Sequence, residues 1–99
     1  MLIVAGHFDV DPDRREQFIT DRVENIRTSR GEDGCIVYAF SPDPIEPGRV
    51  LLFERWESKA ALATHLEALR SAARPADDIP ILGAEIMQYE IGEVGPLGS

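Results

Sequence analysis

Two apolar stretches on either side of a proline-rich turn limit the fold of this chain most. GCIVYAF (34–40) and RVLLFERWE (49–57) flank SPDPIEPG, whose three prolines and single glycine allow only a turn or loop. The two stretches are therefore predicted to pair as a β-hairpin. Positions 36–40 and 50–53 are apolar without interruption, which predicts a sheet that is apolar on both faces.

A strand and a helix are predicted before this hairpin. Residues 2–10 form a strand-like run that stops at Asp11-Pro12, where Asp11 can cap a helix and Pro12 fits its first turn. The helix is predicted to be one amphipathic element that ends at Gly31. Its apolar stripe consists of Phe18, Ile19, Val23 and Ile26.

A second helix and a fourth strand are predicted after the hairpin. Ser58 is a suitable N-cap for a helix that continues to about Arg74. The stretch AEIMQYEIG near the C-terminus is then predicted to form the last strand. The buried side of this second helix is expected to carry Leu62, Leu66, Leu69 and Ala73.

The resulting order, β-α-β-β-α-β, predicts an α+β, ferredoxin-like fold with both helices on one face of an antiparallel sheet. Two helices cover only one apolar face, so the other face is expected to pack on the same face of a second copy, as a homodimer. A chain of 99 residues has room for one core. We expect a single domain over residues 1–93 and a tail over 94–99, whose GPLGS resembles the remnant of a protease-cleavable expression linker.

Charge and cysteine content narrow the choice of partners and compartment. A net charge of −8 argues against nucleic acid and anionic membranes as partners. The only cysteine, Cys35, lies in an apolar run and is expected to be a small buried hydrophobe in a reducing compartment. No apolar stretch approaches the roughly 20 residues that span a bilayer, so we expect a cytoplasmic protein. Metal and nucleotide motifs are absent from the sequence, and no cofactor is expected.

Three residues around the second helix form the candidate site. Glu54 and Trp56 are two positions apart and share a strand face, and a returning helix would bring His65 near the indole. Histidine can remove a proton near neutral pH, and an indole can stack on a planar ring. Each residue also has a structural interpretation: His65 as a packed or capping side chain, Trp56 as a core aromatic, and Glu54 as a partner in an ion pair.

Two further aromatic or titratable residues are weaker candidates. His7 lies in the first strand on the face of Ile3 and Ala5, where a sheet histidine with satisfied hydrogen bonds is the simpler interpretation. Tyr38 is expected to be a core residue with its hydroxyl at a polar rim. Neither residue is specific evidence for a site.

The segment GCIVYAFSPDPIEPGRVLLFERWESKAALATHL resembles the antibiotic biosynthesis monooxygenase family. The features that carry the resemblance are the Gly-Cys strand start, the Asp-Pro turn, Pro-Gly-Arg, Glu-x-Trp, and a histidine nine residues after that tryptophan. The resemblance covers the chain up to about residue 92. It implies a dimeric α+β barrel, in which two ferredoxin-like sheets face each other and each subunit holds a pocket between sheet and helices.

The resemblance also implies an activity and roles for individual residues. Enzymes of this family often oxidise quinols or phenolic compounds with dioxygen, without a metal or flavin. By this resemblance His65 is the candidate base and Trp56 a stacking wall. His7, Arg70 and Tyr38 are then candidate substrate-binding partners, and Glu54 is a structural anchor.

Several positions depart from the family pattern and keep a second interpretation open. Leu69 and Arg70 stand where many relatives carry Pro-His, and Leu52 stands where the polyketide-oxidising branch carries asparagine. The alternative is a non-oxidative binding or stress-associated protein, or an isomerase of a small hydroxylated metabolite. Haem degradation is disfavoured, because Pro75 occupies the place of that branch's haem-ligating histidine.

Overall fold

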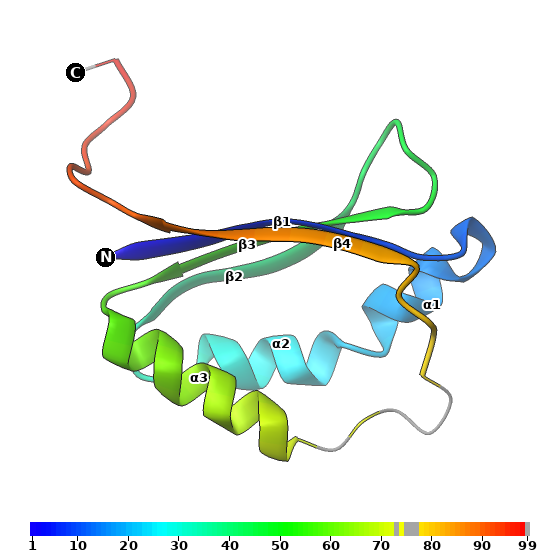
Figure 1. The fold of residues 1–99 in the computed structure, drawn as a ribbon, viewed down its shortest axis with the longest axis horizontal. Helices are drawn as coiled ribbons and strands as arrows, with labels where there is room; N and C mark the ends of the chain where they lie inside the picture. The colour runs from blue at the N-terminus through cyan, green and yellow to red at the C-terminus, as the bar shows by residue number, and fades with distance from the viewer. Residues whose placement is uncertain (73, 75–77, 99) are drawn as a thin grey trace.

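A computed structural model describes residues 1–72, 74 and 78–98 of the chain, and their ribbon is shown in Figure 1. The described elements are β1 (Leu2–Asp9), the 3-10 turn η1 (Pro12–Arg14), α1 (Arg15–Thr20), α2 (Val23–Arg30), β2 (Cys35–Pro42), β3 (Arg49–Trp56), α3 (Lys59–Ser71) and β4 (Gly83–Glu90). The predicted hairpin and strand order are confirmed, and the fold is α+β and ferredoxin-like.

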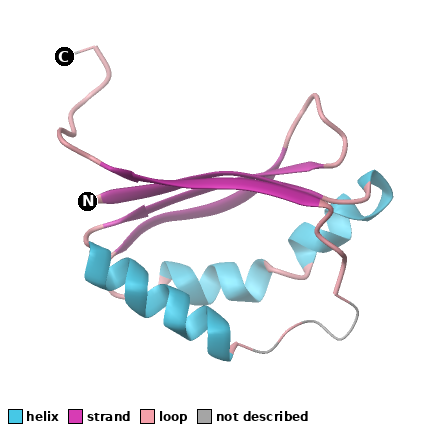
Figure 2. Cartoon of the chain, in the orientation of Figure 1, coloured by secondary structure: helices cyan, strands magenta, loops and turns pink. Residues whose placement is uncertain are grey.

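The strands form one antiparallel sheet in the order β2-β3-β1-β4. All described helices lie on one face of this sheet, as Figure 2 shows. Alternation along β3 separates the two faces: Val50, Leu52, Glu54 and Trp56 point toward the helices and are buried. Among the described residues, no helix is long and apolar enough to cross a membrane.

Gly6 lies in the middle of the central strand β1, where it pairs with Leu52 on one side and Ile86 on the other. Its φ is +156°, and a Cβ added there would lie 1.9 Å from the carbonyl oxygen of Glu85. The backbone of β4 therefore approaches β1 closely at this point, which only glycine permits.

The prediction of one helix from Asp11 to Gly31 is wrong, because the helical segment bends between α1 and α2. The backbone N–H of Arg22 donates to the Ile19 carbonyl at 3.0 Å instead of to the Phe18 carbonyl. The Arg22 guanidinium donates to that Phe18 carbonyl at 3.1 Å and lies over the Phe18 ring. A side chain thus replaces one backbone bond of the helix, which is a known cause of a kink.

The second predicted helix is confirmed as α3, and the Ser58 hydroxyl caps it by accepting a hydrogen bond from Ala61 N–H at 3.1 Å. The helix ends at Ser71, before the predicted Arg74. Leu62 is buried as predicted, but Leu66 and Leu69 are 44% and 40% exposed, so the prediction that they are core residues is wrong. Both line the mouth of a cavity instead. Ala73 lies outside the described residues.

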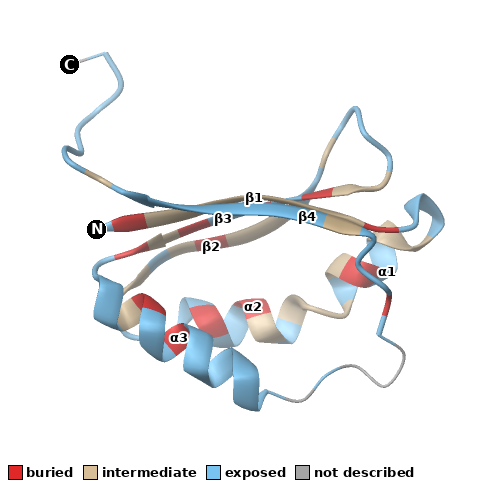
Figure 3. Cartoon of the chain, viewed as in Figure 1, coloured by how far each residue is buried: buried red, intermediate tan, exposed pale blue. Residues whose placement is uncertain are grey.

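The core between sheet and helices has two parts. One is built around Phe18, Val50 and Ile79, and the other around Ile26, Leu62 and Trp56. The opposite face of the sheet has no described helix over it (Figure 2). Along the edge strand β4 nearly every residue is exposed, as Figure 3 shows. By strand alternation several large exposed apolar residues belong to that face, namely Leu51, Phe53, Met87 and Tyr89. Met87, on the edge strand, also borders the cavity between sheet and helices.

Candidate functional site

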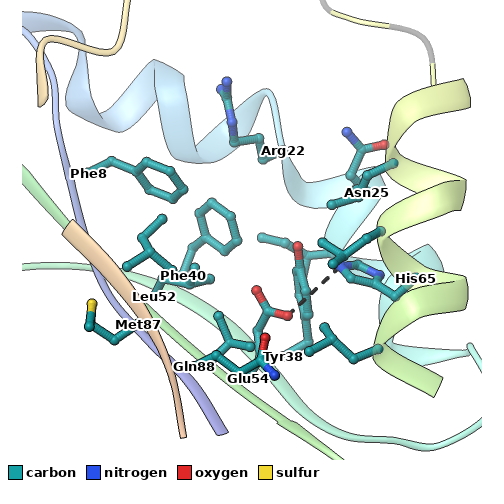
Figure 4. A pocket seen from close by; sticks show the side chains of 16 residues that line it. Phe8, Arg22, Asn25, Tyr38, Phe40, Leu52, Glu54, His65, Met87 and Gln88 are labelled. Atoms are coloured by element: carbon teal, nitrogen blue, oxygen red, sulfur yellow. Dashed lines mark ion pairs between the residues drawn. The ribbon is translucent and has the colours of Figure 1, made fainter. Parts of the chain in front are cut away.

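A cavity of about 410 Å³ lies between the sheet and the helices α2 and α3 (Figure 4). Its volume is within the range typical of small-molecule sites. Most of its wall is apolar or aromatic, with polar groups contributed by Arg22, Asn25, Tyr38, Glu54, His65 and Gln88. Its apolar wall includes Val4, Phe8, Ile26, Phe40, Leu52, Leu62 and Ile86. Such a lining suits a planar apolar ligand with a few polar substituents.

His65 lies in the wall of this cavity beside Tyr38 and Glu54 and is only 1% exposed. Its ring lies 4.5 Å from the Trp56 ring and 5.2 Å from the Tyr38 ring, measured between centroids. Nδ1 is 3.0 Å from Glu32 Oε1, whereas Nε2 is buried and has no hydrogen-bond partner among the described residues. A buried, unpartnered nitrogen in a cavity wall is a natural contact for a polar group of a ligand.

Glu32 reaches His65 because of the loop between α2 and β2. Gly34 in this loop has φ +84°, and a Cβ there would lie 2.5 Å from the Ala61 Cβ. The Gly34 carbonyl also accepts a hydrogen bond from Glu57 N–H at 2.8 Å. This turn lays the loop against α3 one helical turn before His65, so the carboxylate of Glu32 meets the imidazole.

Glu54 connects the site to the core. Its Oε1 accepts a hydrogen bond from Trp56 Nε1 at 2.9 Å and lies 3.8 Å from His65 Nε2. Burial raises the pKa of the Glu54 carboxyl, while the hydrogen bond from Trp56 and the nearby His65 oppose that rise. Because Glu54 also lines the cavity, the predicted structural anchor is placed at the candidate site itself.

Two replacements of Glu54 are expected to separate the effects of its buried charge and of its hydrogen bond on the free energy of unfolding. Glu54→Ala leaves the Trp56 N–H buried without an acceptor and should lower the free energy of unfolding by about 2 kcal/mol. Glu54→Gln keeps an acceptor oxygen and removes the buried charge, so it should be at least as stable as wild type at pH 7. Because the pKa of Glu54 is raised in the folded protein, the wild type loses stability as the pH rises through the titration of this buried carboxyl. The Gln variant has no carboxyl here and does not show this loss. Urea unfolding measures the stability of both variants and its pH dependence. Equal losses of stability in Glu54→Ala and Glu54→Gln would contradict the role of Glu54 as the acceptor for the Trp56 N–H.

Tyr38 is expected to make the fold sensitive to alkali. Burial, reinforced by the Glu54 carboxylate, raises the pKa of Tyr38 to about 12, although a hydrogen bond with Ser29 opposes the rise. An unfolded tyrosine has a pKa of about 10. Because the pKa of Tyr38 is higher in the folded than in the unfolded protein, the stability that its protonated hydroxyl contributes is complete below pH 10. This stability, up to about 2 kcal/mol, is lost as the pH rises toward 12.

Urea unfolding on both sides of that range measures this loss. Tyr38→Phe keeps the ring and removes the titrating hydroxyl, so its stability should fall less with pH. Tyr89→Phe is the matched control, because Tyr89 is 51% exposed, and it should retain the wild-type slope. A wild-type slope in Tyr38→Phe would show that another group causes the alkaline loss.

The structure brings together some of the predicted site residues and separates others. Tyr38, Glu54 and His65 line one cavity. Trp56 is completely buried behind the imidazole, so it supports His65 instead of forming an exposed stacking wall.

His7 and Arg70 are not placed in the cavity. His7 shares its register with Leu51 and Glu85 on the opposite face of the sheet, because side chains alternate along a strand. Arg70 points outward from α3, where its guanidinium is paired with Glu67 at 2.8 Å and its side chain is 73% exposed. The prediction that these two residues contact a substrate inside the cavity is therefore not supported by their positions.

Two residues were not predicted from the sequence: Glu32, which holds His65 but is not part of the cavity lining, and Arg22, which is part of it. Glu32 is 33 positions from His65 and has no periodic signal that relates it to α3. Arg22 enters the cavity wall only because α1 and α2 are separated at its position. Leu52, which by the resemblance departs from the family pattern, lines the cavity as an apolar residue. Pro75, whose identity argues against haem degradation in the sequence analysis, lies outside the described residues.

The chain is similar to known proteins in sequence and in fold. Residues 1–73 match the family model described as antibiotic biosynthesis monooxygenase. A Synechocystis protein, sll1783, is 37% identical over 98 residues, which cover 97% of this chain and 67% of that protein.

Solved structures of low sequence identity share the fold. One is a candidate antibiotic biosynthesis monooxygenase from Deinococcus radiodurans, with 24% identity, a TM-score of 0.77 and complete coverage of both chains. Another is the haem-degrader MhuD from Mycobacterium tuberculosis, with 14% identity and a TM-score of 0.71 over 96% of this chain and 100% of that one. On the family match and the relative from Synechocystis, the chain belongs to the antibiotic biosynthesis monooxygenase family.

Proposed function

We propose that this protein is a monooxygenase that oxidises a small aromatic, phenolic or quinol substrate with dioxygen and without a metal or flavin. The observation that carries the proposal is His65: a buried imidazole in the wall of a largely apolar cavity, with Nδ1 held by Glu32 and with Nε2 unpartnered among the described residues. Family membership supports the oxidative chemistry.

The proposed chemistry begins with removal of a proton from a hydroxyl of the bound substrate. His65 Nε2 accepts this proton, and the positive charge then lies between the carboxylates of Glu32 and Glu54. The substrate anion is electron-rich and supplies all four electrons that reduce dioxygen: one oxygen atom becomes bonded to a ring carbon, the other leaves as water, and the ring is oxidised to a quinone. The apolar walls, including Phe8 and Phe40, exclude water from the anion and orient its ring.

Oxygen dependence tests this function. The protein is incubated with hydroquinone, catechol and naphthols in air and under anaerobic conditions, with ¹⁸O₂ as a label in a parallel reaction. We expect oxygen consumption and a product that carries one labelled oxygen atom. Turnover that continues without dioxygen would favour an isomerase, and binding without any turnover would favour a non-oxidative binding protein.

We propose that the uncovered face of the sheet packs on the same face of a second copy. Leu51 and Phe53 are 37% and 41% exposed there, and Met87 and Tyr89 extend the apolar surface onto β4. A contiguous apolar surface of this kind is costly to leave in water, and a two-fold contact buries it twice.

A charged residue on this face is expected to weaken the dimer. Phe53→Glu should raise the dimer dissociation constant at least about tenfold, because the carboxylate must be desolvated in the interface. Light scattering over a dilution series measures the change. Ile45→Glu is the control, since Ile45 lies in the β2–β3 loop and is 81% exposed. A monomeric wild type at micromolar concentration would refute the proposed dimer.

A reducing compartment, the cytoplasm, is proposed as the location of the protein. Cys35 is the only cysteine of the chain, and its thiol contacts the Val37 carbonyl oxygen at 3.8 Å. Burial and the carboxylates of Glu32 and Glu54 raise the pKa of this thiol, so it stays protonated near neutral pH. These properties suit a cysteine with a packing role.

A further inference from the structure

We propose that Glu32 is a positioning residue that fixes the tautomer of His65, so that Nε2 faces the cavity as a hydrogen-bond acceptor. The role depends on one contact, the 3.0 Å separation of Glu32 Oε1 and His65 Nδ1. An ionised carboxylate has acceptor atoms only, so a hydrogen bond at this place requires the proton on Nδ1. In a neutral imidazole, Nε2 then carries a lone pair and no proton.

The other groups around the imidazole do not set this choice. Trp56 contacts His65 through its ring, and its N–H is already donated to Glu54. Tyr38 meets the imidazole edge to face, and its hydroxyl is hydrogen-bonded with Ser29. Glu54 Oε1 lies 3.8 Å from Nε2, which is beyond hydrogen-bond distance. Among the described residues, the hydrogen bond to the imidazole therefore comes from Glu32 alone.

This tautomer has a consequence for what the cavity accepts. An Nε2 lone pair beside the Glu54 carboxylate makes this part of the cavity wall an acceptor surface. A ligand meets that surface best with a neutral hydroxyl, and it meets it poorly with a methyl ether or a carboxylate. The catalytic use of this hydroxyl rests on the proposed function, in which His65 deprotonates the bound hydroxyl.

The tautomer is measured in the ligand-free protein, by nitrogen NMR of the imidazole side chains. Wild type should show a protonated, pyrrole-type Nδ1 and an unprotonated, pyridine-type Nε2 on His65. Glu32→Gln replaces an acceptor-only group by an amide of equal size, and the Nε2–H form should appear. It should appear in Glu32→Ala as well. Asp33→Asn removes the same charge from an exposed neighbour in the same loop and should leave the wild-type spectrum.

An Nε2–H tautomer in wild type, or an unchanged tautomer in both Glu32 variants, would overturn the proposal.

The predicted ligand preference is tested under anaerobic conditions by measuring the binding of hydroquinone and of its dimethyl ether, 1,4-dimethoxybenzene. Wild type should prefer hydroquinone at least about tenfold, and Glu32→Ala should reduce that preference below about threefold. An unchanged preference in Glu32→Ala would contradict the proposed link between the His65 tautomer and the preference for a hydroxyl. Neither measurement depends on oxygen turnover, so failure of the monooxygenase proposal is detected separately.

Discussion

Gly6→Ala is expected to lower the free energy of unfolding by about 3 kcal/mol or more. The added methyl group would lie 1.9 Å from the Glu85 carbonyl oxygen and 2.8 Å from the Ile86 Cα. Both atoms belong to the backbone of β4, which cannot rotate away as a flexible side chain can. The variant must therefore move the two strands apart, and the hydrogen bonds between β1 and β4 are lost with that movement.

Urea unfolding followed by circular dichroism measures this effect, with Gly92→Ala as the matched control. A Cβ at Gly92 meets nothing within 4 Å, so that variant should match wild type. If Gly6→Ala were as stable as Gly92→Ala, the close approach of β4 to β1 would be incorrect. The position of Ile86 and Gln88 in the cavity wall would then be incorrect as well.

His65→Ala is expected to reduce the oxygen-dependent turnover of a phenolic or quinol substrate about 1,000-fold. The variant removes the only imidazole in the cavity wall described here, and general base catalysis commonly contributes two to four orders of magnitude. Added imidazole should restore part of the rate, because the space left between Trp56 and Tyr38 has the size of the lost ring. Turnover is measured with an oxygen electrode.

Two controls separate catalysis from packing in this experiment. Thr64→Ala changes the preceding residue of α3, which is exposed, and should keep the wild-type rate. His65→Gln fills more of the space than alanine but cannot act as a base, so it should be as inactive as His65→Ala. Full activity in His65→Gln would show that the imidazole only packs against its aromatic neighbours.

The elements that the sequence predicted correctly are those with strong local signals. The proline-rich turn defined the β2–β3 hairpin, and Ser58 defined the start of α3. The prediction failed at the bend between α1 and α2, because the Arg22 side chain takes over the Phe18 carbonyl, a contact without a sequence pattern. Leu66 and Leu69 follow a helical stripe as core residues do, but α3 reaches past the core and they border a cavity.

The candidate site was predictable only where its residues share an element or a family pattern. Glu54 and Trp56 are two positions apart on one strand, and His65 follows in the next helix. The contact between Glu32 and His65 depends on how a loop folds against α3, so no spacing in the chain reveals it. His7 shows the opposite case, because its strand alternation already indicated the other face of the sheet.

We propose that this protein binds its ligand in the cavity beside His65, and the two histidines of the chain allow a direct test. Hydroquinone is titrated under anaerobic conditions while nitrogen NMR follows both imidazoles. We expect a saturable shift of the His65 Nε2 resonance and no shift at His7, which lies on the opposite face of the sheet. A shift confined to His7, or saturable binding that leaves His65 unchanged, would contradict it.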